Sequence, residues 1–152
     1  MSRFRRWGVV LVAVLLTGTA CGSGPNLVPR TTTGTTGLAT VVLTDGTTRA
    51  AVLAGSTDYV RARSGRIVSA VGTPNAVAGS VKQGAVVDAV VLPAGPALDR
   101  VRDELVTAPS RLGRVRGTVY YAAPVTSKGA LFVQYLLTAR GRAQLTAHGV
   151  AP

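Results

Sequence analysis

The chain has 152 residues, a length that fits one domain. It is 47% hydrophobic and 15% charged, which excludes a disordered tail and allows a buried core. Its formal charge is +11, but the arginines are scattered and few aromatic residues accompany them, so we expect no nucleic-acid partner.

The first 20 residues have the pattern of a secretory signal. Met1–Trp7 is short and basic, and Val9–Leu16 is an apolar run of eight residues. Such a run is too short to span ~30 Å of hydrocarbon, which takes about 20 residues. Small residues then lead to the chain's single cysteine, Cys21. We therefore predict a signal peptide over residues 1–20.

The position of Cys21 resembles that of the acylated cysteine in bacterial lipoproteins. The resemblance implies cleavage before Cys21, a palmitate-type lipid on its sulfur, and anchoring on the extracytoplasmic side of the cell membrane. Gly18 departs from the Leu or Val usual three residues before that cysteine. The alternative is ordinary cleavage that leaves a free thiol. Two or three acyl chains would make the anchoring stable.

Residues 21–37 continue as GSGPNLVPRTTTGTTG after the cysteine, without hydrophobic periodicity. A sequence so rich in Gly, Ser, Thr and Pro is typical of a flexible linker. We expect a lipid-attached tether here that holds a domain of residues 38–152 away from the membrane.

Strand and helix patterns alternate from residue 38 to 107. Thr73 is suited to cap the second helix, with Pro74 at its first position, and Leu98, Val101 and Leu105 give the third helix an apolar stripe. This order predicts parallel strands with right-handed crossovers, hence an open α/β sheet. The expected strands span 39–43, 66–71 and 87–92, and the expected helices span 48–63, 74–83 and 96–106.

The last third of the chain adds a strand over 118–123 and two helices. The first helix has an apolar stripe that includes Phe132 and Leu136. Thr138 can cap the second, short helix, which Gly149 ends.

The chain's end, FVQYLLTARGRAQLTAHGVAP, resembles the C-terminal end of periplasmic solute-binding proteins, most of all the molybdate-binding family. GAVVDAVVL, which contains Asp88, resembles that family's third strand. The resemblance covers about 110 residues, from the first strand to the chain end. It implies a mostly parallel open sheet with C-terminal helices packed on it, and a task of presenting an oxyanion to an ABC importer.

The resemblance also places two hydroxyls near the ligand. Thr44 follows the first strand, and Thr73 lies in the second ligand loop. Both threonines also suit helix N-caps, which require no ligand, and we favour that interpretation. Asp45, in the first loop, would repel an anion.

The second lobe of that family is missing from the sequence. Only TAPSRLGRVRG lies between Val106 and Thr118, whereas one β-α-β unit takes 30 or more residues. We therefore expect a single-lobe fold with half of the ligand shell absent.

The sequence contains no catalytic, phosphate-loop or zinc motif, and its acids and single His148 are dispersed. We expect no enzyme activity, no cofactor and no metal site. Two functions remain open. One is an anchored lobe that binds an oxyanion such as molybdate for an ABC permease. The other is an envelope scaffold that binds no solute and contacts a protein partner or a second copy through its exposed lobe face.

Overall fold

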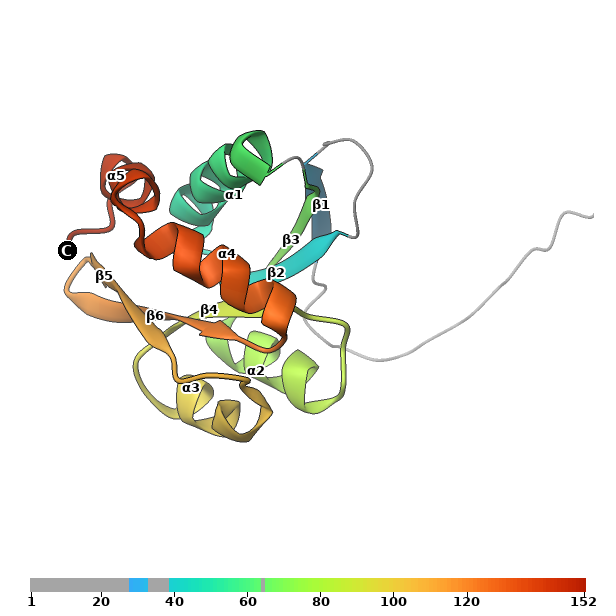
Figure 1. Ribbon diagram of the computed structural model, residues 1–152. Coiled ribbons are helices and arrows are strands. Elements are labelled where there is room, and N and C mark those ends of the chain that lie inside the picture. Colours follow the sequence, from blue (N-terminus) through green and yellow to red (C-terminus); the bar gives the residue numbers. More distant parts are fainter. Residues whose placement is uncertain (1–27, 33–38, 64) are drawn as a thin grey trace, which may run out of the picture.

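Six strands form one mixed sheet in the spatial order β1-β3-β2-β4-β6-β5 (Figure 1). The computed structural model describes residues 28–32, 39–63 and 65–152. The elements in chain order are β1 (Val28–Thr32), β2 (Thr40–Asp45), α1 (Arg49–Arg63), β3 (Ile67–Gly72), α2 (Pro74–Lys82), β4 (Ala89–Pro93), α3 (Pro96–Arg100), η1 (Arg102–Glu104), β5 (Ser110–Val115), β6 (Thr118–Pro124), α4 (Ser127–Leu137) and α5 (Ala139–Ala147).

The expected α/β architecture is confirmed. Strands β3, β2 and β4 are parallel and are joined by α1 and α2, as the alternating pattern predicts. The outer strands are antiparallel to their neighbours, so the parallel part of the sheet is its centre. Helices α1, α4 and α5 cover one face, and α2 and α3 cover the other (Figure 1).

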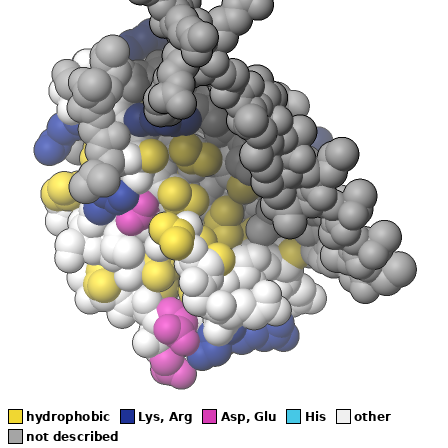
Figure 2. Space-filling model, turned by 90° about the vertical axis from the view of Figure 1, so that its right-hand side faces the viewer, with side chains coloured by type: hydrophobic (Ala, Val, Ile, Leu, Met, Phe, Trp, Pro, Cys, Tyr) yellow, Lys and Arg dark blue, Asp and Glu magenta, His cyan; other side chains and the backbone are white. Residues whose placement is uncertain are grey.

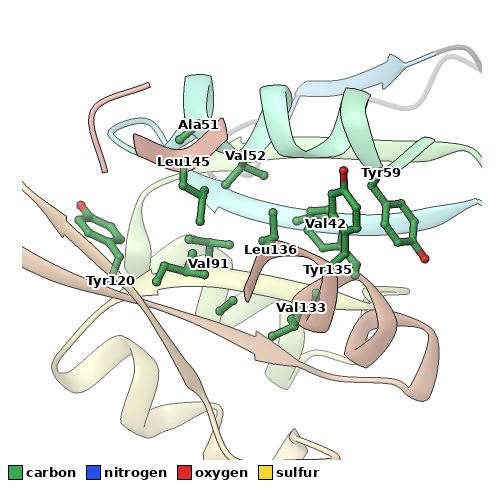
Figure 3. Packing of buried hydrophobic residues seen from close by; sticks show 14 of the residues in the cluster. Val42, Ala51, Val52, Tyr59, Val91, Tyr120, Val133, Tyr135, Leu136 and Leu145 are labelled. Atoms are coloured by element: carbon green, nitrogen blue, oxygen red, sulfur yellow. The ribbon is translucent and has the colours of Figure 1, made fainter. Parts of the chain in front are cut away.

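Each face of the sheet has its own hydrophobic cluster. On one face, Tyr59 of α1 lies edge-on to Phe132 and Tyr135 of α4, with ring centroids 5.5 and 5.3 Å apart. Figure 3 shows Tyr59 and Tyr135 within this cluster. Gly55 of α1 leaves space for Leu136 of α4, because a Cβ at Gly55 would lie 2.6 Å from Leu136 Cδ2. On the other face, Val77 and Leu98 pack against the sheet.

The predicted helix over 96–106 is wrong beyond Arg100. The chain passes through η1, and Leu105 is already extended. The N–H of Val106 donates to the carbonyl oxygen of Pro124 at 3.0 Å, which draws the backbone out of the helix and toward β6.

Two edge strands were not expected. β5 lies in the segment between Val106 and Thr118, and it contains only two apolar side chains, Leu112 and Val115. β1 lies within the expected tether and pairs with β3 from Val28↔Val71 to Thr32↔Ile67. The other residues of the expected tether lie outside the described residues.

Asp88 joins β4 to both β2 and α4. Its N–H donates to the Val41 carbonyl at 2.8 Å, and its Oδ2 accepts from the Val41 N–H at 2.7 Å. Its Oδ1 accepts from the Thr126 hydroxyl at 2.6 Å, while Lys128 Nζ lies 3.0 Å from Oδ2. Gly129 lies against Asp88 so closely that a Cβ would be 1.7 Å from the Asp88 carbonyl oxygen.

Gly129→Ala should therefore destabilise the fold by roughly 3 kcal/mol or more, because the obstructing atom is backbone and cannot rotate away. Gly79→Ala is the matched control, since Gly79 is also a helical glycine but has open space at its Cβ. We expect Gly79→Ala to stabilise by up to about 1 kcal/mol through helix propensity. Urea unfolding measures both variants, and equal free energies of unfolding would contradict the role given to Gly129.

Candidate functional site

The parallel strands β2, β3 and β4 end along one border of the sheet, here called the carboxyl edge. Open α/β sheets bind ligands at this border. The loop after β2, the start of α2 at Thr73, and the loop after β4 lie there. The turn between β5 and β6 lies at the same edge, because Tyr120 pairs with Pro93 at the end of β4.

Thr44 is buried at this edge, with 1% of its surface exposed. Its Oγ1 lies 2.6 Å from the Thr48 Oγ1 and 3.4 Å from the Asp45 carbonyl oxygen. Because the Thr48 hydroxyl donates its proton to Asp45 Oδ1 at 2.8 Å, Thr44 must be the donor to Thr48. Thr44 therefore has no proton left to offer an oxyanion, and its hydroxyl does not cap α1.

Asp45, not Thr44, organises the start of α1. Its Oδ1 accepts from the Thr48 N–H at 3.0 Å. Its Oδ2 accepts from the Tyr120 hydroxyl at 2.8 Å, which ties β6 to the loop after β2. Burial raises the pKa of Tyr120 above its ordinary value, so this hydroxyl stays protonated and continues to donate. Asp45 thus places a buried negative charge at the edge where an anion would bind.

Thr73 acts as the predicted N-cap. Its Oγ1 accepts from the Ala76 N–H at 3.3 Å, and Pro74 is the first residue of α2. The register places Thr73 beside the loop after β2, since Asp45 pairs with Gly72. Thr73 is exposed whereas Thr44 is buried, so the two hydroxyls do not face a common ligand space.

A half-open cleft of about 620 Å³ lies farther along the carboxyl edge. It is lined by Gly46, Thr47, Val115, Arg116, His148 and Gly149. Arg116 and Gly117 form the two-residue turn between β5 and β6, with φ values of 50° and 86°. Two positive φ values are the signature of a type I′ hairpin turn, in which arginine is uncommon. Arg116 is not recognisable as a site residue from the sequence, because the pattern of β5 did not predict a strand there.

The tyrosines and acids otherwise have structural roles. Tyr120 is a core residue and Tyr121 is half-buried. Arg102 pairs with Asp99 and Lys82 pairs with Glu104, both at 2.9 Å on the surface.

In the described part of the chain, no three His, Cys, Asp or Glu side chains gather as metal ligands, and no helix is long and apolar enough to cross a bilayer. Cys21 lies outside the described residues.

Neither protein-family models nor curated proteins contain a match to this chain.

A buried acid joins the three helices on one face of the sheet. Asp58 of α1 accepts from Arg140 Nε at 2.7 Å and from the hydroxyl of Tyr135 in α4. The Arg140 guanidinium, followed by Tyr135, lowers the pKa of Asp58 to about 2. No signal in the sequence pointed to this contact, which joins residues 82 positions apart.

The depressed pKa of Asp58 predicts pH-dependent stability. The contribution of the pair is fully present above the ordinary carboxyl pKa of 3.8 and is lost as the pH falls toward about 2. Arg140→Gln should therefore be less stable than the native chain at pH 5 to 7, with the difference shrinking from about pH 4 to 2. Urea unfolding of both proteins between pH 7 and 2 measures this difference in the free energy of unfolding.

Arg142→Gln is the control for Arg140→Gln. Arg142 is on the same helix, and its side chain bonds the Leu137 carbonyl oxygen without a carboxylate partner in the described residues. A stability loss in Arg140→Gln that stays constant down to pH 2, or that Arg142→Gln reproduces, would contradict the assignment.

Proposed function

We propose that the chain is a bacterial envelope lipoprotein, anchored through Cys21, whose lobe acts as an interaction surface and not as a solute trap. The leader and Cys21 support the anchor. The likeness of the chain end and of the Asp88 strand to molybdate-binding proteins supports descent from a solute-binding lobe. The observation that carries the proposal is the Thr44 hydroxyl, which is buried and already donates its proton inside the fold.

The β5–β6 hairpin supports the same proposal. A solute-binding protein of two lobes closes on its ligand between them. In this chain the only residues between β5 and β6 are Arg116 and Gly117, which leave no room for an inserted lobe. An anion at the carboxyl edge would therefore stay in contact with water, where each hydrogen bond contributes less than in a closed cleft.

One observation favours a second candidate, binding of an oxyanion such as molybdate for an ABC importer. The cleft at the carboxyl edge carries Arg116 and His148, and Thr73 is exposed beside its loop. These groups can attract an anion without Thr44. The second candidate therefore predicts binding that depends on Arg116 and Thr73.

A thermal-shift series separates the two functions. A specific ligand at 100 times its dissociation constant stabilises by about 2.7 kcal/mol, which corresponds to roughly 10 °C for a domain of this size. We expect no such shift with molybdate, tungstate, sulfate or phosphate, at concentrations below those at which sulfate and phosphate stabilise proteins in general. A saturable shift that Thr73→Ala or Arg116→Asn abolishes would establish the transport candidate instead.

Labelled palmitate tests the anchor. We expect the label to enter the native chain in a bacterial host that acylates lipoproteins, and to be absent from Cys21→Ser, since the thiolate is the acylated group. Equal labelling of both proteins, or of neither, would reject anchoring through Cys21.

A further inference from the structure

We infer that the carboxyl edge of the sheet faces the membrane and that its arginines dock on the anionic headgroups of the bilayer. The inference rests on the proposed lipid anchor at Cys21 and names the partner of the proposed interaction surface. It is carried by two independent observations, the place where β1 begins and the distribution of charge.

The first observation is the position of Val28. Because β1 is antiparallel to β3, Val28 pairs with Val71 at the end of β3, so the described chain enters the sheet at the carboxyl edge. Six residues lie between Cys21 and Val28, and the seven Cα-to-Cα steps from one to the other span at most about 25 Å. An acylated Cys21 therefore keeps Val28, where the chain enters this edge, within about 25 Å of the bilayer surface. Part of the expected tether, Val28–Thr32, is built into the sheet as β1.

The width of the sheet is compatible with contact between the bilayer surface and the carboxyl edge from β1 to β5. Six strands spaced about 4.8 Å apart extend over about 24 Å from β1 to β5. The turn at Arg116 can therefore reach the same plane as Val28. Electrostatic attraction to a charged surface acts within about 10 Å at ordinary ionic strength, a distance that the short connection permits.

The second observation is the charge at the carboxyl edge. Arg116 is exposed at the tip of the hairpin turn, and Arg114 is exposed on β5. Arg49 is half-buried and is the first residue of α1, which begins at the same edge. None of the three has a salt-bridge partner among the described residues. The buried acid of this edge, Asp45, is bonded to Thr48 and Tyr120 and is 5% exposed.

The exposed acids are confined to α3 and η1. Asp99 is in the first turn of α3, which follows the loop after β4, and it pairs with Arg102 at 2.9 Å. Asp103 and Glu104 are on η1. Glu104 pairs with Lys82, the last residue of α2, at the edge opposite to the one where α2 begins. Figure 2, which looks at the molecule from the right-hand side of Figure 1, shows acidic side chains at the bottom of that face with basic side chains beside them, and a further acidic side chain at the upper left. The pairing of Glu104 with Lys82 turns Glu104 away from a negatively charged bilayer when the carboxyl edge approaches it.

Binding to lipid vesicles tests the inference without the anchor. The chain from Gly22 onward contains every described element and lacks Cys21. We expect it to float with vesicles of phosphatidylglycerol and phosphatidylcholine, not with phosphatidylcholine alone, and to be released by salt.

The edge variant is Arg49→Gln combined with Arg116→Asn. Both changes suit the fold, because Asn favours positive φ and loss of a cation suits a helix N-terminus. Each basic residue near an anionic surface contributes about fivefold to partitioning, so the pair should weaken it at least tenfold. The control is Arg61→Gln with Arg63→Gln, which removes the same charge from the far end of α1 and should weaken binding less than threefold.

Three results would overturn the inference. The first is equal weakening by the edge and control variants, which indicates general charge attraction. The second is displacement of the protein by soluble glycerol phosphate, which indicates a site for one free anion. The third is a concentration-dependent dimer that the edge variant dissociates, which assigns the edge to a second copy. Palmitate labelling is a separate measurement, so a chain that is labelled but does not float keeps the anchor and loses this inference.

Discussion

The position of Asp88 is the constraint on which the rest of the fold depends. A carboxylate that is 5% exposed is tolerated when charged and polar donors satisfy it, and here the donors come from β2 and α4. The backbone of Asp88 binds the same two regions, since its carbonyl oxygen accepts from the Val125 and Thr126 N–H groups. One residue therefore fixes the register at which β4 begins and the place where the C-terminal helices return to the sheet.

This return explains why a single lobe forms a complete fold. Once Gly129 lies against Asp88, α4 covers the centre of the sheet, and α5 reaches α1 through Arg140 and Asp58. The chain end then pairs with β5, where Arg114 and Ala151 exchange two backbone hydrogen bonds. These contacts cover one face of the sheet, while α2 and α3 cover the other (Figure 1). The cleft lies at the carboxyl edge, which in a protein of two lobes is where the ligand lies.

The sequence predicted the features that depend on local pattern. The β-α-β-α-β order and the caps at Thr73 and Thr138 follow from residue spacing and short-range hydrogen bonding, and the structure contains them. Edge strands were missed because β1 and β5 are short and polar, and their partners are supplied by distant parts of the chain. The buried state of Thr44 was likewise not predictable, because a Thr after a strand looks the same whether its hydroxyl points to solvent or to Thr48.

The contacts that bury acidic side chains also determine which charges the protein exposes at its surface. Without the three arginines of the expected signal peptide, 14 basic residues face six acids. Three of those acids, Asp45, Asp58 and Asp88, are buried with internal partners. Lys128 and Arg140 neutralise two of them, and the exposed acids are confined to α3 and η1. The charged side chains on the rest of the described surface are therefore basic, and an extended anionic surface would favour orientations that turn α3 and η1 away from it. Because the formal charge is the same for every arrangement of these residues, that orientation is a property of the fold and not of the composition.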